Sequence, residues 1–313
     1  MFHLHGQLVE VILKLYGQLG MSVVVGYGLG KLLPKAVPTS LGQFLFWVGS
    51  PLSIVIFIYR ADLSAQVWMA PIAAWLASLL GLALAWGWIQ RQKLWEPPTQ
   101  ASFLLTSMFG NTGYIGFPII LALVGEKYAG WALFYDLLGT VLGVYTLGIF
   151  LVVGLGTPGK ESGKVWQFLL INPALWSLVL GLGLRRFTIS PVVEQSLLAL
   201  GWGMIFVSLV LIGMRLSHLD SWSSLSRSRV SLGIKMILVP LVLGCSLPLL
   251  GITGNVQLVL VLQVGTPPAI ASLVLAEIYD LDRDLTVGAI AIGSTAFLFT
   301  LPLWLLLFPP NFL

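Results

Sequence analysis

The sequence predicts an all-helical protein that crosses a membrane ten times, with its helices arranged as two inverted halves of five. Three observations predict this fold class. The 313 residues are 58% hydrophobic and only 9% charged, with a mean hydropathy of +0.96, whereas soluble domains carry about 25% charged residues. Apolar runs long enough to span a bilayer recur along the chain. Two Gly/Pro-rich interruptions stand at corresponding places in its two halves.

The apolar runs are bounded by short connections that are rich in turn-forming residues, such as "LPKAVPTS" and "GTPGKESGK". None of these connections is long enough to separate two soluble domains. The predicted spans are 7–32, 41–60, 65–90, 101–124, 128–155, 164–185, 191–216, 230–250, 256–278 and 285–308.

Lys and Arg are divided unevenly between the two sides that these spans define. Ten of the 16 lie in connections after odd-numbered spans, and five lie on the opposite side. Because positively charged connections are retained in the cytoplasm, both termini are predicted on the non-cytoplasmic side. We expect a bacterial inner or plasma membrane, with membrane lipids as partners. The basic residues are scattered rather than clustered, which predicts no nucleic-acid partner.

Similar stretches recur at nearly equal offsets. The Glu-x-Tyr sequences that begin at Glu126 and Glu277 follow the two interruptions, and Leu63–Ser64 corresponds to Leu216–Ser217. Because each half would hold an odd number of spans, the second half must enter the membrane from the opposite side. The sequence therefore predicts an inverted repeat, with halves 1–156 and 157–313.

The stretches "FGNTGYIGFP" in span four and "QVGTPPA" in span nine interrupt otherwise apolar helices. Irregular backbone at membrane depth persists only when it is buried in protein or lines a watery cavity. Paired interruptions in corresponding spans indicate the central site of a transporter. The alternative is that they only kink helices or allow close packing, but the pairing favours a site. The candidate substrate-binding residues are Asn111, Gly113, Tyr114, Pro118, Gln263, Gly265, Thr266, Pro267 and Pro268.

Two charged residues inside spans are candidates for ion or proton coupling. Asp136 lies well inside span five, so it is either a proton or cation site or a carboxyl group kept neutral or paired within the bundle. Lys235 lies near an end of span eight, where snorkelling to the surface is the favoured interpretation and substrate binding the alternative. Gln263 has two interpretations as well, a ligand contact or an interhelical hydrogen bond.

Several stretches resemble the auxin efflux carrier family: "GNTGYIGFPIILALVGEKYAG", "LQVGTPPAIASLVLAEIYDLD", "FWVGSPLSIVIF", "LLINPALWSLVLGLGL" and "IKMILVPLVL". The resemblance implies ten helices in a five-plus-five inverted repeat, a scaffold domain, and a transport domain that moves as an elevator. In many members two copies form a homodimer. It also implies that helices four and nine cross at their prolines beside the substrate, which is auxin or a dicarboxylate.

Individual residues match the motifs of this family. By resemblance, Asn111 corresponds to an asparagine that helps to bind a carboxylate. Pro118 corresponds to the first crossing proline, and Pro267 or Pro268 to the second. One stretch differs, because "SAQVWMAPIAAW" in span three lacks the charged pair of the plant exporters. This difference disfavours auxin itself.

The function that the sequence predicts is secondary transport, in the export direction, of a small organic anion. The alternative is a ligand-binding membrane sensor that keeps the carrier fold. We expect no signalling domain after "FPPNFL", which favours the carrier. An enzyme is disfavoured because the chain has no H-E-x-x-H, G-x-S-x-G or Walker A motif. No cofactor and no metal are predicted.

Overall fold

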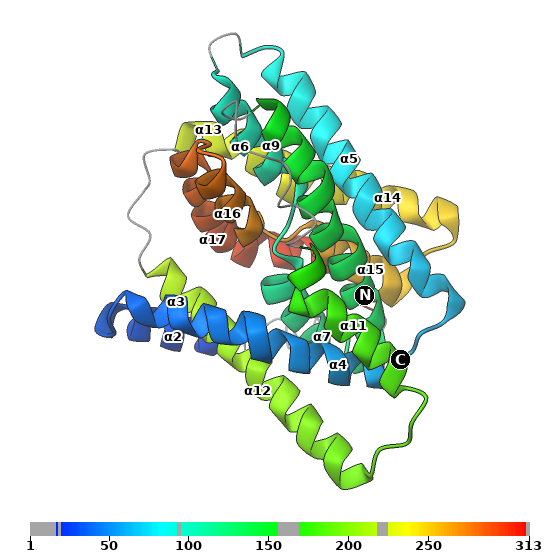
Figure 1. The fold of residues 1–313 in the computed structure, drawn as a ribbon. Coiled ribbons are helices and arrows are strands. Elements are labelled where there is room, and N and C mark those ends of the chain that lie inside the picture. The colour runs from blue at the N-terminus through cyan, green and yellow to red at the C-terminus, as the bar shows by residue number, and fades with distance from the viewer. Residues whose placement is uncertain (1–16, 18–19, 93–94, 156–168, 218–224, 311–313) are drawn as a thin grey trace. The chain divides into compact units, whose positions relative to one another are not determined.

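The computed structural model describes residues 17, 20–92, 95–155, 169–217 and 225–310, and these residues form helices joined by short connections (Figure 1). Helices suit an apolar chain because they satisfy their backbone groups within one segment, where no water is available. Six segments are long and apolar enough to cross a membrane, which agrees with the predicted class of polytopic membrane protein. They are Ala36–Arg60, Ala65–Ile89, Glu126–Leu155, Pro191–Leu216, Arg227–Leu250 and Arg283–Leu307.

Four shorter apolar helical segments lie in the other predicted spans. They are Met21–Leu32, Thr112–Leu123, Pro173–Leu184 and Gly254–Val264. Two of the corresponding predicted spans, 7–32 and 164–185, begin outside the described residues. The other two, 101–124 and 256–278, are the spans predicted to be interrupted, and each is divided into two helices. The total of ten spans and the inverted repeat stay predictions.

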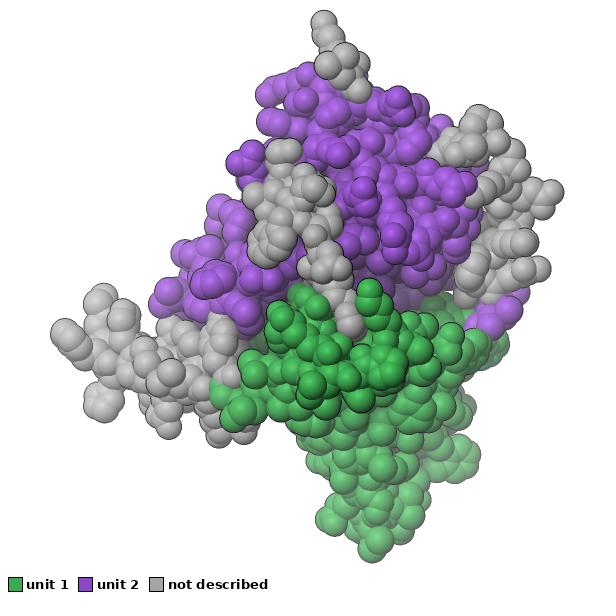
Figure 2. Space-filling view, turned by 90° about the vertical axis from the view of Figure 1, so that its left-hand side faces the viewer, with its two compact units in different colours: residues 1–64, 113–133, 172–219 green, residues 65–112, 134–171, 220–313 purple. Residues whose placement is uncertain are grey.

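The chain packs as two compact units, and each unit takes segments from both sequence halves (Figure 2). Unit 1 comprises Met1–Ser64, Gly113–Leu133 and Asn172–Leu219. Unit 2 comprises Ala65–Thr112, Phe134–Ile171 and Asp220–Leu313. The predicted halves 1–156 and 157–313 divide the chain by sequence, whereas the units divide it by packing. The predicted halves therefore do not coincide with the units, and the division into halves stays a prediction.

Unit 1 is built around the long helix α12, on which α2 packs closely. Gly26 and Gly213 make this contact possible, because a side chain at Gly26 would meet the Val210 carbonyl oxygen at 2.0 Å and one at Gly213 would meet the Val23 carbonyl oxygen at 2.0 Å. The helices of this unit are α2 (Met21–Leu32), α3 (Ala36–Phe44), η2 (Leu45–Gly49), α4 (Ser50–Arg60), α7 (Phe117–Leu123), η5 (Glu126–Tyr128), α11 (Pro173–Leu184) and α12 (Pro191–Leu216). Two further elements, η4 (Thr112–Gly116) and α8 (Ala129–Phe134), each have one end residue in unit 2.

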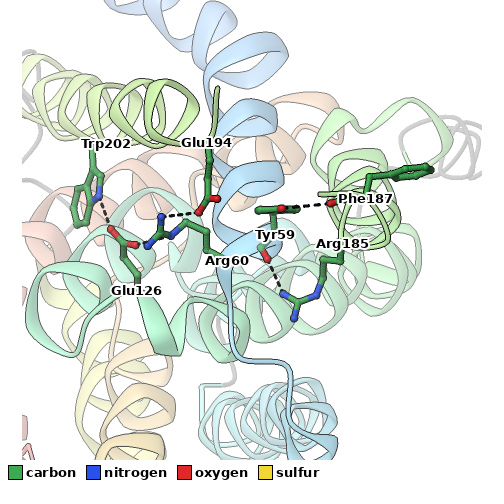
Figure 3. A network of polar contacts seen from close by, with 7 residues as sticks. All are labelled: Tyr59, Arg60, Glu126, Arg185, Phe187, Glu194 and Trp202. Carbon is green, nitrogen blue, oxygen red and sulfur yellow. Dashed lines mark hydrogen bonds and ion pairs between the residues drawn. The ribbon is translucent and has the colours of Figure 1, made fainter. Parts of the chain in front are cut away.

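Polar side chains of unit 1 gather where α4 ends, and Figure 3 shows them. Arg60 forms ion pairs with Glu126 (Nε–Oε2 3.2 Å) and Glu194 (Nη1–Oε1 2.8 Å), and the Trp202 indole N–H donates to Glu126 Oε1 at 2.9 Å. Arg185 Nη1 donates to the carbonyl oxygens of Ile58, Tyr59 and Ala61 at 2.6–2.9 Å. These bonds satisfy the last carbonyl groups of α4 and hold the segment after α7 to the rest of the unit.

Unit 2 contains both helices of the second interrupted span and the first helix of the other. Its helices are η3 (Ala65–Trp68), α5 (Met69–Ile89), α6 (Pro97–Met108), η6 (Tyr135–Val141), η7 (Val144–Gly148), α9 (Ile149–Leu155), α13 (Leu225–Gly233), η9 (Ile234–Leu238), α14 (Val239–Ser246), η10 (Leu247–Leu250), α15 (Gly254–Val264), α16 (Ile270–Ile278) and α17 (Arg283–Leu307).

Asp282 bonds to residues at the beginnings of three helices of unit 2. Its carboxylate accepts from Arg227 Nη1 at 2.8 Å and from Thr99 Oγ1 at 3.0 Å, and it caps α17 by accepting from the Leu285 N–H at 2.9 Å. Asp282 thus fixes the beginnings of α6, α13 and α17 to each other.

Candidate functional site

The first interrupted span loses its helical form at Phe109. Helix α6 ends at Met108, and Phe109 is extended, with φ −103° and ψ 132°. The chain then runs through Gly110 and Asn111 before it turns again in the π-helical segment η4. Glycine-rich sequence explains the break, because glycine is the residue that least favours a helix interior apart from proline.

The second interrupted span breaks between α15 and α16. Helix α15 ends at Val264, and α16 begins at Ile270 after an extended Ala269 with φ −66° and ψ 139°. Pro267 and Pro268 stand in the gap. Because neither proline carries an N–H group, α15 cannot continue its hydrogen-bond pattern through them.

The two breaks pair with each other inside unit 2. Gly110 and Pro268 form an antiparallel β-bridge. The Asn111 N–H donates to the Pro267 carbonyl oxygen at 2.7 Å, and the Ala269 N–H donates to the Phe109 carbonyl oxygen at 2.9 Å. Backbone groups that leave a helix at membrane depth need partners, since lipid supplies none. Here each break supplies partners to the other.

Gly110 packs tightly against the second break. A side chain at this position would meet the Thr266 hydroxyl oxygen at 2.2 Å and the Lys235 ammonium nitrogen at 3.0 Å. The resemblance places the crossing at Pro118, but the bridge forms at Gly110. Pro118 lies in the helical segment Thr112–Leu123, where η4 passes directly into α7.

The other candidate residues divide between the two units. Asn111, Gln263, Gly265, Thr266, Pro267 and Pro268 belong to unit 2 and are buried, whereas Gly113, Tyr114 and Pro118 belong to unit 1. Unit 2 therefore brings together six of the nine predicted substrate contacts. Asn111 is 7% exposed, while Gln263 and Thr266 are fully buried.

Asp136 is tied to the first break. It is buried on the π-helical turn η6, and the Thr112 hydroxyl donates to its Oδ1. Thr112 directly follows Asn111, so the carboxyl group is connected to the break through one hydrogen bond. π-Helical turns occur frequently at functional sites. Both interpretations of Asp136, as a coupling site and as a paired carboxyl group, fit this position.

Lys235 does not snorkel. Its side chain is only 3% exposed, and its ammonium group donates to the Val264 carbonyl oxygen at the end of α15. The snorkelling interpretation was wrong because an unpaired carbonyl within reach of the ammonium is a better partner than a distant surface. The π-helical turn η9 contains Lys235 and lies in the same unit as the second break.

Sequence reasoning did not identify Gly110 and Thr112 as parts of this site. Gly110 offered a signal, since it precedes Asn111 within the glycine-rich stretch. Thr112 offered none, because its role depends on Asp136, which lies 24 residues away. Among the described residues, no group of three His, Cys, Asp or Glu side chains is placed to hold a metal ion.

Comparison with known proteins gives one family. The family model described as membrane transport protein matches residues 12–305. An uncharacterized transporter of Methanothermobacter thermautotrophicus is 26% identical over 287 residues, which cover 90% of this chain and 93% of the relative. An uncharacterized transporter of Methanocaldococcus jannaschii is 24% identical over 291 residues, which cover 90% and 94%. These findings confirm the resemblance found in the sequence.

Proposed function

Because this chain belongs to the membrane transport protein family, we propose that it is a secondary carrier that exports a small organic anion. The anion is a carboxylate, either a dicarboxylate or an auxin-like compound. The chain is a transporter rather than an enzyme, so the proposal concerns the substrate, the direction and the mechanism.

The observation that carries the proposal is the pairing of the two breaks in unit 2. The bridge between Gly110 and Pro268 holds irregular backbone in the interior of the unit. Helix α16 begins at the second break, and the N–H groups at the N-terminus of a helix favour an anion. The carbonyl end of α15, which carries a partial negative charge, is already bound to the Lys235 ammonium. The charge that this arrangement still favours is negative.

Asn111 is the side chain proposed to bind the carboxylate. Its backbone N–H is bound to Pro267, which fixes the residue at the pairing of the breaks. An asparagine side chain offers two N–H donors to a carboxylate. Loss of one hydrogen bond to a charged ligand costs about 1.5–3 kcal/mol, which is roughly a ten- to hundredfold loss of affinity.

The division into two units supports an elevator mechanism. Six of the nine proposed contacts belong to unit 2, so this unit would carry the substrate while unit 1 serves as the scaffold. Coupling to protons would involve Asp136, the buried carboxyl group that Thr112 holds next to Asn111.

Purified protein in liposomes tests the proposal. Labelled mono- and dicarboxylates are screened with and without imposed pH gradients, and Asn111→Ala is compared with the parent protein. We expect uptake of at least one carboxylate and a ten- to hundredfold weaker affinity in Asn111→Ala. Asp136→Asn should lose the response to the pH gradient. Binding without uptake would support the sensor, and unchanged affinity in Asn111→Ala would place the substrate elsewhere.

A further inference from the structure

The end of α15 lacks two of the donors that a continuing helix would supply. In an α-helix, each carbonyl oxygen accepts from the N–H group four residues later. The partners of Gln263 and Val264 would be the N–H groups of residues 267 and 268, and both are prolines. Without substitutes, the Val264 carbonyl would lack its helical donor and the Gln263 carbonyl would keep only a long bond from the Thr266 N–H at 3.4 Å, at a considerable cost inside the protein.

Two side chains replace these missing donors. The Thr266 hydroxyl donates to the Gln263 carbonyl oxygen at 2.7 Å, and the Lys235 ammonium donates to the Val264 carbonyl oxygen. Thr266 is fully buried and Lys235 is 3% exposed. The substitute at Gln263 is neutral and comes from the same break, whereas the substitute at Val264 is a cation that comes from another helix.

A cation is electrostatically suited to this position. The carbonyl end of a helix carries a partial negative charge, and discontinuous helices of transporters use such ends and unwound carbonyls to coordinate sodium ions or protons. A sodium ion requires oxygen ligands of this kind. The Val264 carbonyl accepts from the Lys235 ammonium, and the Thr266 hydroxyl oxygen and the ammonium both lie beside Gly110.

We propose that the Lys235 ammonium is a built-in cation at the carbonyl end of α15, in the place where a sodium-coupled carrier would hold its ion, so that this protein binds no sodium at the break. The inference deepens the proposed carrier function, because it concerns the ion that accompanies the substrate. It rests on contacts within unit 2, and its test requires no transport.

The packing around Gly110 places the ammonium beside the first break as well as the second. A side chain at Gly110 would meet both the Lys235 nitrogen and the Thr266 oxygen, so the first break covers the two donors directly. The π-helical turn Ile234–Leu238 contains Lys235. The buried ammonium therefore lies against both breaks.

Thermal unfolding of the purified protein, in sodium chloride and in choline chloride at equal ionic strength, tests this inference. The parent protein should melt at the same temperature in both salts. Lys235→Ala, which vacates the carbonyl end, should melt lower than the parent in choline. Sodium should then raise its melting temperature in a saturable manner, by about 2–4 °C. Lys35→Ala, which removes an exposed lysine, is the matched control and should show no sodium effect.

Lys235→Arg, which keeps a charged donor, is the second variant and should stay indifferent to sodium. If Lys235→Ala can be purified only in sodium, that result also supports the inference. Stabilisation of the parent by sodium would overturn it, and so would a Lys235→Ala protein that sodium does not stabilise. Anion uptake is measured separately, so a failure of the proposed function would not be confused with a failure of this inference.

Discussion

The two interrupted spans carry similar sequences but continue into different surroundings. After the first break, the chain enters unit 1, where Glu126 binds Arg60 and Trp202. After the second break, α16 stays in unit 2, and the connection that follows it is fixed by Asp282. The two Gly/Pro-rich stretches therefore determine where the helices break. The contacts of the segments that follow determine that α7 belongs to unit 1 and α16 to unit 2.

The largest expected effect on stability comes from disturbing the contact between the two breaks at Gly110. Gly110→Ala places a methyl group within 2.2 Å of the Thr266 oxygen, so either the Thr266 hydroxyl or the bridge must move. We expect the free energy of unfolding to fall by about 3 kcal/mol, measured by thermal unfolding in detergent. The control is Gly87→Ala in α5, where nothing lies within 4 Å, and it should be neutral or slightly stabilising. Equal stability of the two variants would show that the pairing of the two breaks tolerates a side chain at position 110.

The next effect concerns the anchor that follows the second break. Asp282→Ala removes the cap of α17, the ion pair with Arg227 and the hydrogen bond from Thr99. We expect a loss of about 2 kcal/mol, since a cap alone contributes about 1 kcal/mol and the partly exposed ion pair contributes less than a buried one. Asp284→Ala, a change in the first turn of the same helix, should cost less than half as much.

The prolines of the two breaks should differ in importance. Pro268→Ala adds an N–H donor that competes with Lys235 for the Val264 carbonyl, so the local backbone shifts and the bridge with Gly110 weakens. Pro118 forms no part of the bridge and lies inside the helical segment Thr112–Leu123, where alanine adopts the helical conformation readily. We expect Pro268→Ala to lower stability by about 1–2 kcal/mol and Pro118→Ala by less than about 0.5 kcal/mol. The opposite order would show that the crossing depends on Pro118.

The smallest effect belongs to the anchor after the first break. Glu126→Gln keeps an acceptor for the Trp202 indole but removes the ion pair with Arg60, whose side chain is 36% exposed. We expect a loss of about 0.5–1 kcal/mol at low salt that shrinks as the salt concentration rises. Unfolding curves measured at two ionic strengths provide the check. A loss that does not depend on salt would mean that Glu126 contributes through packing rather than charge.

The parts of the fold that could be predicted are those that depend on local composition. The predicted span 191–216 coincides with α12, because Ser190 and Pro191 begin a helix whose apolar run is uninterrupted. Both breaks were found because glycine and proline act on the residues next to them. What the sequence could not reveal depends on groups that are distant along the chain.

Lys235 and Gly110 illustrate this limit. The distance of Lys235 from the end of its span predicted snorkelling, but its partner is a carbonyl 29 residues away whose donor was removed by a proline. Both Gly110 and Pro118 can interrupt a helix, and only the segment between α15 and α16 decides which of them forms the bridge. The segments that make up each unit escaped prediction for the same reason, since each unit combines segments from both halves of the chain.

The pairing of the breaks also has a consequence for amide hydrogen exchange. Pro267 and Pro268 have no amide hydrogen, so the bonds between the breaks are donated by two amides, those of Asn111 and Ala269. An amide exchanges with solvent deuterium only when its hydrogen bond opens. The deuterium uptake of these two residues therefore reports on the opening of the crossing itself. Uptake that is slow and equal at both positions would mean that the two breaks separate together, as one cooperative event.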